Sequence, residues 1–320
     1  MPSLTIGPVT ARLPIIQGGM AVRISLAPLA GAVAREGGVG IIAGSGLEPE
    51  ELVEQIRAAR AIAGPDGVIG VNIMVAVRAF ADLVHAALDE GIDLLIAGAG
   101  FSRDVFEWCR EAGTPMIPIV GSERVAQLSQ RFGASAVIVE SVEAGGHLGT
   151  DETLDVLLPR IIEAVDIPVI AAGGIATGAD IKRALDMGAA GVQMGSRFVA
   201  TTESSAPEDF KRMYVEADQD DIVLIQSPVG LPGRALRSPL TDRLHAGDNP
   251  IIERCVACLK KCGKDFCIMD KLVRSQAGDV IEGLVFAGNS AVQVKDIPSV
   301  AELMERLVAE WRAANEGATA

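Results

Sequence analysis

Four cysteines stand within thirteen residues of this sequence, at Cys255, Cys258, Cys262 and Cys267. Their spacing, C-x2-C-x3-C-x4-C, places four thiolates on one short segment that could ligate an iron–sulfur cubane, although the spacing is not the ferredoxin one. A structural Zn²⁺ is a second interpretation, although zinc usually takes two separated cysteine pairs. Redox-active or unliganded thiols are a third. We predict a [4Fe–4S] cluster and leave the other two open.

Two glycine turns form a second pattern with chemical meaning. Gly173 and Gly174 lie in "AAGGIATGADI", and Gly195 and Ser196 lie in "QMGSRF". Exposed backbone N–H groups in such turns can hold an anion, above all where a helix begins. The pair of turns predicts a phosphate-binding site, with ordinary tight turns as the alternative.

The candidate catalytic residue is His147, which lies in "ESVEAGGHLGT" between small residues. Small neighbours let a ligand approach, and imidazole can exchange protons near neutral pH. A structural, hydrogen-bonded histidine is the alternative interpretation. His85 lies in a helical pattern and His245 in a polar loop, so we expect structural or solvated roles for both. Cys109 is expected to be a buried core thiol.

A third group of residues could bind a heterocycle. "QGGMA" contains Gly19 and Met20, and "VNIM" contains Asn72, each at the end of an apolar segment. A buried side-chain amide needs hydrogen-bond partners, which the edge of a heterocycle can supply. Packing alone is the alternative for each of these segments.

Eight short apolar segments, each bounded by turn residues, must position these groups. Strand starts recur about 20–30 residues apart, with helical patterns between them, which is the length of one βα unit. Apolar runs without alternation indicate strands buried on both faces of a parallel sheet. The segments are "LPIIQGG", "GVGII", "VIGVNIM", "IDLLIAG", "TPMIPIV", "ASAVIVE", "IPVIAAGG" and "AAGVQMG".

Eight such units in series predict an α/β fold, a closed (β/α)8 TIM barrel, with an open doubly wound sheet as the alternative. Functional residues of these barrels lie at the C-terminal ends of the strands. The glycine turns follow the seventh and eighth segments, and Asn72 and His147 stand at strand ends. The pattern therefore predicts a phosphorylated cofactor lying across the barrel mouth.

The alternation of predicted strands and helices ends near residue 200. We expect residues 1–200 and 296–320 to form the barrel with a closing C-terminal helix, which begins at a Ser299–Glu302 capping box. Residues 201–295 are expected to form a lid or insertion after the eighth strand, and this insertion carries the cysteine-rich metal or cluster loop.

Composition limits the classes of function. Apolar residues make up 49 % of the 320 residues and aromatic residues 3 %, and the net charge is −14. The acidic balance argues against nucleic-acid binding. No apolar run approaches the length of a membrane span, and the N-terminus lacks a signal-peptide pattern. We expect a cytoplasmic enzyme without a membrane partner.

Six segments in order carry a family resemblance: "PIIQGGMA", "AREGGVGIIAG", "GVNIM", "EAGGHLG", "IPVIAAGGIATG" and "QMGSRFV". They resemble the nitronate monooxygenase (2-nitropropane dioxygenase) family, which includes the flavin-type enoyl-acyl-carrier-protein reductases. The resemblance covers residues 10–200 and implies FMN as cofactor. It implies that the FMN phosphate lies at Gly173, Gly174, Gly195 and Ser196. It places the flavin ring near Met20, Asn72 and Gln193, with Gly145 and Gly146 close by, and makes His147 the active-site histidine. Gly19, Glu140 and Met194 are further expected cofactor-binding residues.

The resemblance leaves the reaction open. The reductases are the more similar branch at Glu140 and in the "QGGM" and "VNIM" motifs. This similarity implies hydride transfer from FMN to an α,β-unsaturated acceptor. "VFAGNSAV" departs from the family pattern before the last helix. Electrons would come from NAD(P)H or the predicted cluster; no dinucleotide fingerprint is present. Nitronate oxidation with O₂ is the alternative, and a flavin-free phosphate-binding barrel is the second. Small-molecule or acyl-thioester substrates, a one-electron carrier protein and a second copy of the chain are candidate partners.

Overall fold

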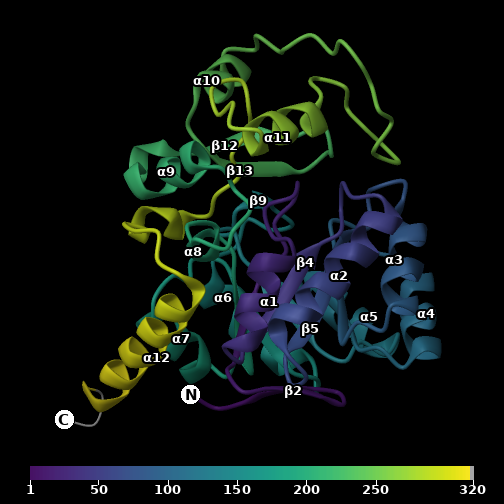
Figure 1. Ribbon diagram of the computed structural model, residues 1–320, viewed down its shortest axis with the longest axis vertical. Coiled ribbons are helices and arrows are strands. Elements are labelled where there is room, and N and C mark those ends of the chain that lie inside the picture. The colour runs from purple at the N-terminus through teal and green to yellow at the C-terminus, as the bar shows by residue number, and fades with distance from the viewer. Residues whose placement is uncertain (318–320) are drawn as a thin grey trace.

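Eight parallel strands close into a barrel in the computed structural model, which describes residues 1–317 (Figure 1). The order around the barrel is β10-β11-β3-β4-β5-β6-β7-β8, and β8 pairs with β10 to close it. Each of the eight predicted segments contains one of these strands, except that β4 extends one residue beyond the second segment, so the barrel prediction is confirmed. The strands are β3 (Ile15–Gln17), β4 (Val39–Ala43), β5 (Val68–Met74), β6 (Leu94–Gly98), β7 (Met116–Val120), β8 (Val137–Glu140), β10 (Val169–Ala172) and β11 (Gly191–Met194).

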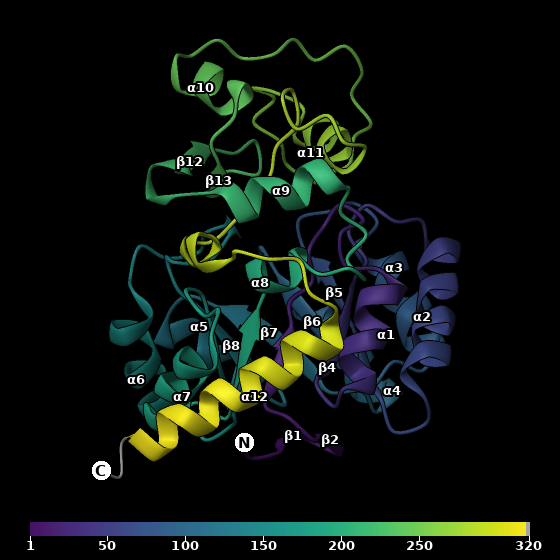
Figure 2. The ribbon, with the colours of Figure 1, turned by 60° about the vertical axis from the view of Figure 1, so that its left-hand side comes forward.

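The barrel interior is filled by branched aliphatic side chains. Ile41, Ile96, Ile138 and Ile170 lie in one buried cluster inside it, each fully buried. The hairpin formed by β1 (Leu4–Ile6) and β2 (Val9–Ala11) adds Leu4, Ile6 and Ala11 to the same cluster. This hairpin lies below the barrel in Figures 1 and 2, so the N-terminal face is closed and a ligand must enter from the opposite end.

Helices surround the barrel and bury the outer faces of its strands. They bury one face each, as at Leu52, Ile56 and Ala59 of α2. Where a side-chain cap forms, it follows the local sequence: Thr177 and Asp180 make a reciprocal capping box at the start of α7. The helices are α1 (Ala27–Arg35), α2 (Pro49–Ala63), α3 (Phe80–Asp89), α4 (Asp104–Ala112), α5 (Glu123–Arg131), α6 (Leu154–Ala164), α7 (Gly178–Asp186) and α8 (Ser196–Val199).

A smaller layer covers the open end of the barrel (Figures 1 and 2). Its sheet has the order β12-β13-β9, in which β9 (Gly146–His147) comes from the loop after β8. The other elements are α9 (Glu208–Glu216), η1 (Gln219–Asp221), β12 (Ile222–Gln226), β13 (Pro232–Leu236), α10 (Pro239–His245), α11 (Ile268–Gln276) and η2 (Asn289–Gln293). Because β9 pairs with β13, the loop that carries His147 is part of this upper layer.

The C-terminal helix α12 (Val300–Gly317) runs across the outside of the barrel next to α7 (Figure 2). It begins at the predicted capping box: the Ser299 N–H donates to Glu302 Oε2 at 2.8 Å, and the Glu302 N–H donates to Ser299 Oγ at 3.2 Å. The final residues of the predicted barrel segment, 318–320, lie outside the described part of the chain.

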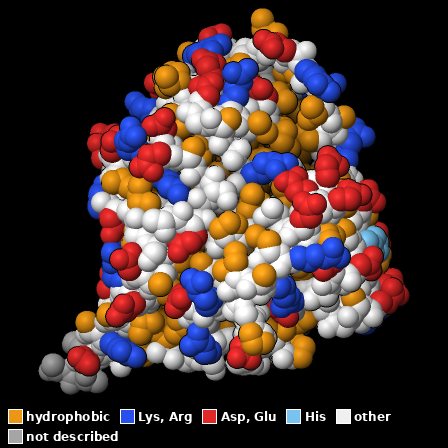
Figure 3. All heavy atoms as spheres, viewed as in Figure 1, with side chains coloured by type: hydrophobic (Ala, Val, Ile, Leu, Met, Phe, Trp, Pro, Cys, Tyr) orange, Lys and Arg blue, Asp and Glu red, His pale blue; other side chains and the backbone are white. Residues whose placement is uncertain are grey.

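Acidic and basic side chains are interspersed over the face shown in Figure 3, rather than gathered into a field of one sign. Among residues 1–317, no helix combines the length and apolar character that a membrane crossing requires.

One ion-pair cluster joins the barrel to α12. The Arg197 side chain on α8 is 5 % exposed and donates to Asp296 Oδ1 at 2.6 Å, and Arg306 of α12 contacts the other oxygen of Asp296 at 2.7 Å. These partners hold the pKa of Asp296 below its usual value, with the Arg306 hydrogen bond as the main cause. Asp296 is thus the carboxylate that compensates a buried guanidinium.

Replacement of Asp296 tests this junction. The Asp296→Ala variant leaves Arg197 buried without its carboxylate, so we expect the free energy of unfolding to fall by about 2 kcal/mol, less than for a fully buried pair because Asp296 is partly exposed. Glu305→Ala, which removes an exposed carboxylate from α12, is the matched control and should change it by less than about 0.5 kcal/mol. Urea unfolding measures both, and equal effects would contradict the assignment.

Candidate active site

Strand alternation places a polar layer on top of the apolar barrel interior. Ala136 and Ile138 face the interior cluster, so Glu140, two residues further along β8, faces inward at the mouth. Glu140 is in register with Ala172 of β10, which is in register with Gln193 of β11. The small Ala172 thus lies between two inward polar side chains. Asn72 occupies the corresponding level on β5, beside Ala43.

The structure brings together every cofactor and catalytic residue predicted from the sequence. All of them line one cavity of about 230 Å³ at the C-terminal end of the barrel strands. They are Gly19, Met20, Asn72, Glu140, Gly145, Gly146, His147, Gly173, Gly174, Gln193, Met194, Gly195 and Ser196.

Gln193 carries a signal that points to a ligand. The residue is 8 % exposed, and its Oε1 atom has no hydrogen-bond partner among the described residues. A buried acceptor without a partner costs free energy, so such atoms generally meet a water or a ligand. An N–H at the edge of a flat heterocycle would satisfy this oxygen.

Glycines keep the cavity open where the heterocycle and phosphate are expected. A Cβ atom on Gly19 would come within 2.5 Å of the Asn72 Cβ, so only glycine allows this approach. A Cβ on Gly146 would meet no atom within 4 Å, and one on Gly195 would meet only Met20, so side chains at these positions would occupy cavity space. The Met20 N–H donates to Ser25 Oγ at 2.8 Å, which fixes the loop after β3.

The two predicted phosphate turns meet at one side of the cavity. Gly173 and Gly174 have φ values of 104° and 72°, which favour glycine, and this conformation follows β10 directly. Ser196 Oγ accepts a hydrogen bond from the Gly288 N–H at 3.0 Å, so a third backbone segment joins the two turns. The cavity fits a flat heterocycle that carries a phosphate, as FMN does. The heterocycle would meet the unpaired amide oxygen of Gln193 and the space beside the glycines, and the phosphate would meet the two turns.

His147 is held between the barrel and the upper layer. Its backbone is in register with Gly233 of β13, its Nε2 lies 2.8 Å from Ser227 Oγ, and its ring meets the Phe286 ring edge-on at a centroid distance of 5.1 Å. Burial lowers the pKa of His147 to about 4. The imidazole is therefore neutral at physiological pH. It can donate or accept a hydrogen bond, but it is not an imidazolium ion that could act as a general acid.

Glu140 is affected by burial in the opposite direction. Removal from water raises the pKa of its carboxyl group to about 7, since burial disfavours the charged form. A carboxyl group with this pKa is protonated in a large share of molecules near neutral pH, so it can donate a hydrogen bond as well as accept one.

Several cavity residues were missed by the sequence analysis. Phe286, Gly288 and Ser290 line the cavity from the segment before α12, and the Tyr214 hydroxyl donates to the Phe286 carbonyl. The only feature of the sequence that pointed to this segment was the departure of "VFAGNSAV" from the family pattern. Ser227, which contacts His147 without lining the cavity, gave no sequence signal, because the two residues are 80 positions apart.

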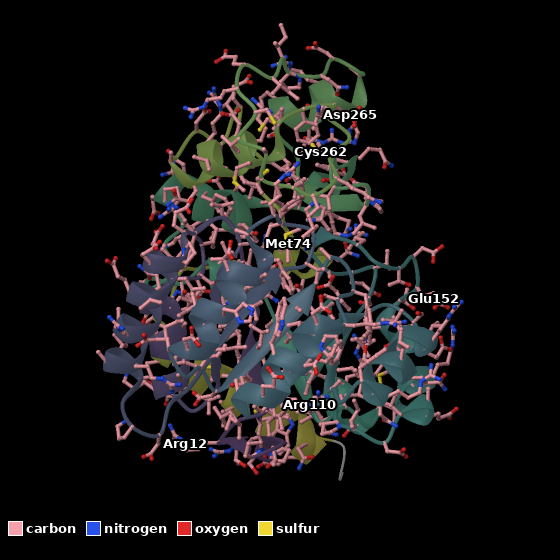
Figure 4. The ribbon with its side chains drawn as sticks, turned by 90° about the vertical axis from the view of Figure 1, so that its right-hand side faces the viewer. Arg12, Met74, Arg110, Glu152, Cys262 and Asp265 are labelled. Atoms are coloured by element: carbon pink, nitrogen blue, oxygen red, sulfur yellow. The ribbon has the colours of Figure 1, made fainter. Side chains whose placement is uncertain are left out.

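The metal prediction for the cysteines is not supported. No group of three or more candidate ligands within residues 1–317 is arranged to hold a metal ion. Cys255 and Cys262 are exposed, whereas Cys258 and Cys267 are half-buried. The other three cysteines lie close enough to Cys258 to act on its charge: burial first, and then Cys267, Cys262 and Cys255, raise the pKa of the Cys258 thiol. Backbone contacts hold the segment at two places: the Arg78 N–H donates to the Cys258 carbonyl, and the Gly263 N–H donates to the Pro228 carbonyl. Figure 4 shows Cys262 in the upper layer, above Met74 at the barrel rim.

The other two histidines and Cys109 have structural environments, and one arginine nearby fixes the active-site loop. The His85 ring packs on Trp108 at a centroid distance of 4.6 Å, and His245 Nε2 lies 2.7 Å from the Leu224 carbonyl. Cys109 is 1 % exposed, and burial raises its pKa to about 12. Arg234 donates through Nε and Nη2 to the Val142 carbonyl, so it fixes the loop that leads to His147.

Comparison with known sequences agrees with this site. The sequence profile of the nitronate monooxygenase family matches residues 3–90 and 66–310. A Mycobacterium tuberculosis protein named (3aS,4S,5R,7aS)-5-hydroxy-7a-methyl-1-oxo-octahydro-1H-indene-4-carboxyl-CoA dehydrogenase is 35 % identical over 78 % of this chain and 70 % of its own length. A probable nitronate monooxygenase of Staphylococcus aureus is 26 % identical over 74 % of this chain and 79 % of its own.

Comparison with solved structures gives the same result. FabK from Thermotoga maritima superposes with a TM-score of 0.86 at 34 % identity, covering 97 % of this chain and 96 % of its own. A nitroalkane oxidase from Streptomyces ansochromogenes superposes with a TM-score of 0.82 at 26 % identity, covering 96 % and 98 %. With its barrel, its cavity and these matches together, the chain belongs to the nitronate monooxygenase family of FMN-dependent oxidoreductases.

Proposed function

We propose that this enzyme reduces the carbon–carbon double bond of an α,β-unsaturated acyl thioester, with NAD(P)H as the source of electrons. Two similar proteins act on acyl thioesters: the Mycobacterium tuberculosis dehydrogenase is named for a carboxyl-CoA substrate, and FabK is an enoyl-acyl-carrier-protein reductase. Both are at least 34 % identical to this chain, compared with 26 % for the nitroalkane oxidase.

The upper part of the cavity supports an acyl substrate. Apolar side chains line it from the barrel rim and from the upper layer, and the Phe286 ring lies beside His147. They are Met74, Ile119, Leu272, Leu284 and Phe286. Apolar walls stabilise a hydrocarbon chain by removing it from water, whereas a small nitronate anion needs little apolar surface.

The observation that carries the proposal is the position of the His147 ring, which packs against Phe286 beside this apolar wall. An imidazole whose pKa is about 4 does not hold a proton to transfer at pH 7, but its N–H group is a good hydrogen-bond donor. A neutral histidine can polarise a carbonyl group in this way. We assign His147 to the thioester carbonyl, where its hydrogen bond withdraws electrons from the double bond and orients the substrate.

The remaining cavity residues would hold FMN, which supplies the hydride when bound. Gly173, Gly174, Gly195 and Ser196 would hold the phosphate through the two turns. Asn72, Glu140 and Gln193 would bind the polar edge of the ring, with Gln193 Oε1 accepting a ring N–H. NAD(P)H would dock transiently from the open side, because the sequence has no dinucleotide fingerprint.

Residues 201–295 would act as the lid in this account. Its sheet carries β9 and therefore His147, so displacement of the lid would also displace the group that orients the substrate. The lid also excludes water from the apolar part of the cavity, and this strengthens each hydrogen bond inside.

Nitronate oxidation is the second candidate function, because the matching family profile carries that name and the nitroalkane oxidase covers nearly the whole chain. A neutral histidine donor could bind the nitronate oxygen atoms. Deprotonation of a neutral nitroalkane fits less well, since an imidazole with a pKa of about 4 is a weak base.

His147→Ala tests the proposed function. We expect NAD(P)H-dependent reduction of 2-enoyl-CoA substrates to fall about 100-fold in kcat/KM, while bound flavin stays constant, because one preorganised donor is lost. The control is His85→Ala, which removes a ring from the outer helix α3 and should keep wild-type turnover. Product formation is followed by mass spectrometry and NAD(P)H absorbance. Turnover by wild-type protein that does not depend on His147 would refute the assignment.

Glu140→Gln tests the buried carboxyl group. The folded pKa of about 7 exceeds the unfolded value near 4.5, so the folded state keeps a proton that the unfolded state releases, and stability decreases as pH rises through this window. From pH 5 to pH 8, the free energy of unfolding of the flavin-free wild-type protein should therefore fall by about 2 kcal/mol. The Glu140→Gln variant should not show this decrease.

Urea unfolding at the two pH values measures the Glu140 contribution. Glu163→Gln, which changes an exposed carboxylate on α6, is the control and should follow the wild type at both pH values. If Glu140→Gln also follows the wild type, the carboxyl group is ionised in the folded protein and cannot act as a donor.

A further inference from the structure

Ser227 is the polar partner of His147 and belongs to neither the cofactor turns nor the substrate wall. It follows β12 directly, in the turn that leads to β13, and is 6 % exposed. Its Oγ lies 2.8 Å from His147 Nε2. The proton between these two atoms can belong to either one, and its location decides what the other face of the imidazole can do.

The surroundings of the hydroxyl group decide the location of that proton. The Val229 N–H donates to Ser227 Oγ at 3.3 Å, so one lone pair of the oxygen is already used. If His147 Nε2 also donated to this oxygen, the Ser227 proton would have no acceptor within the described chain, since the structure shows no other partner for this hydroxyl. If Ser227 donates to His147 instead, the proton and both heavy atoms are satisfied.

The turn that carries Ser227 is itself held in place. The Ser227 N–H donates to the Leu231 carbonyl at 3.2 Å, and the Gly230 N–H donates to the Ser227 carbonyl at 2.9 Å. The Gly263 N–H from the cysteine-rich segment donates to the Pro228 carbonyl at 2.8 Å. The same segment is anchored to the barrel rim, where the Lys260 N–H donates to the Ala76 carbonyl at 2.9 Å. The hydroxyl therefore has a fixed position relative to the barrel.

We propose that Ser227 is a positioning residue that donates its hydroxyl proton to Nε2 of neutral His147, fixes the Nδ1–H tautomer and leaves Nδ1–H as the donor for a carbonyl oxygen in the cavity. The Nε2 lone pair is then occupied, so the ring cannot serve as a base at that atom unless Ser227 moves away. The inference deepens the proposed function, because the tautomer supplies the donor that an acyl thioester requires.

Nitrogen NMR of the flavin-bound enzyme, labelled with ¹⁵N-histidine, reads the tautomer directly. The chain has three histidines, so His147 can be assigned from the signals missing in His147→Asn. In the wild type at pH 7.5 we expect a protonated, pyrrole-type Nδ1 and an unprotonated, pyridine-type Nε2. Imidazolium or a protonated Nε2 would overturn the proposal, and this result needs no variant of Ser227.

Variants of Ser227 give the second measurement. In Ser227→Ala, the Nε2 signal should shift towards the protonated form, and kcat/KM for the enoyl thioester should fall about tenfold, as for one lost hydrogen bond. Ser227→Thr, which keeps a hydroxyl group, should restore both. The control is Ser275→Ala, which changes a buried serine that lines the cavity and whose hydroxyl donates to the Leu284 carbonyl; it should leave the His147 nitrogen signals unchanged.

The two readouts separate this inference from the proposed function. Unchanged nitrogen signals in Ser227→Ala would overturn the role of Ser227 even if enoyl thioesters are reduced. The expected tautomer in an enzyme that reduces no enoyl thioester would support the role of Ser227 and refute the proposed substrate.

Discussion

Closure of a parallel barrel around an apolar interior is the constraint on which the rest of this structure depends. Closure fixes the register between neighbouring strands, and alternation then fixes which side chains face inward at the mouth. Asn72, Glu140 and Gln193 are the inward polar positions of their strands, directly above the isoleucine-filled interior. Their positions therefore follow from the same hydrogen bonds that hold the barrel together.

The upper layer completes the site through one short strand. β9 leaves the barrel after β8 and pairs with β13, so the backbone of His147 is fixed by residues far away in the sequence. The pKa of His147 is low because this layer removes the ring from water. The same layer supplies Phe286 beside the ring and Ser227 at Nε2. The orientation of the substrate that we propose and the protonation state of the histidine would thus have a common structural origin.

Local patterns predicted the barrel and its turns well, because the physical causes are local. Buried parallel strands require apolar runs such as "IDLLIAG", and the turns after β10 and β11 require glycine, so both are visible in one sequence. The roles of individual residues in holding FMN stay predictions, although all of them line the cavity. Ser227 and Phe286 could not be found, because their positions depend on strand pairing and packing across long separations. The cluster predicted from the four cysteines is not supported, because short spacing does not decide how thiols are arranged: no group within residues 1–317 is arranged to hold a metal ion, and tertiary hydrogen bonds fix the course of the segment between the rim and the lid.

The most direct test of the account is the oxidative half-reaction under anaerobic conditions. The flavin-bound enzyme is reduced with one equivalent of NADPH or NADH and then mixed with a 2-enoyl-CoA in a stopped-flow spectrometer without oxygen. We expect the oxidised flavin absorbance to return in a single turnover with formation of saturated acyl-CoA. A flavin that stays reduced with every enoyl thioester, or that is reduced by a nitronate and reoxidised only by O₂, would contradict it.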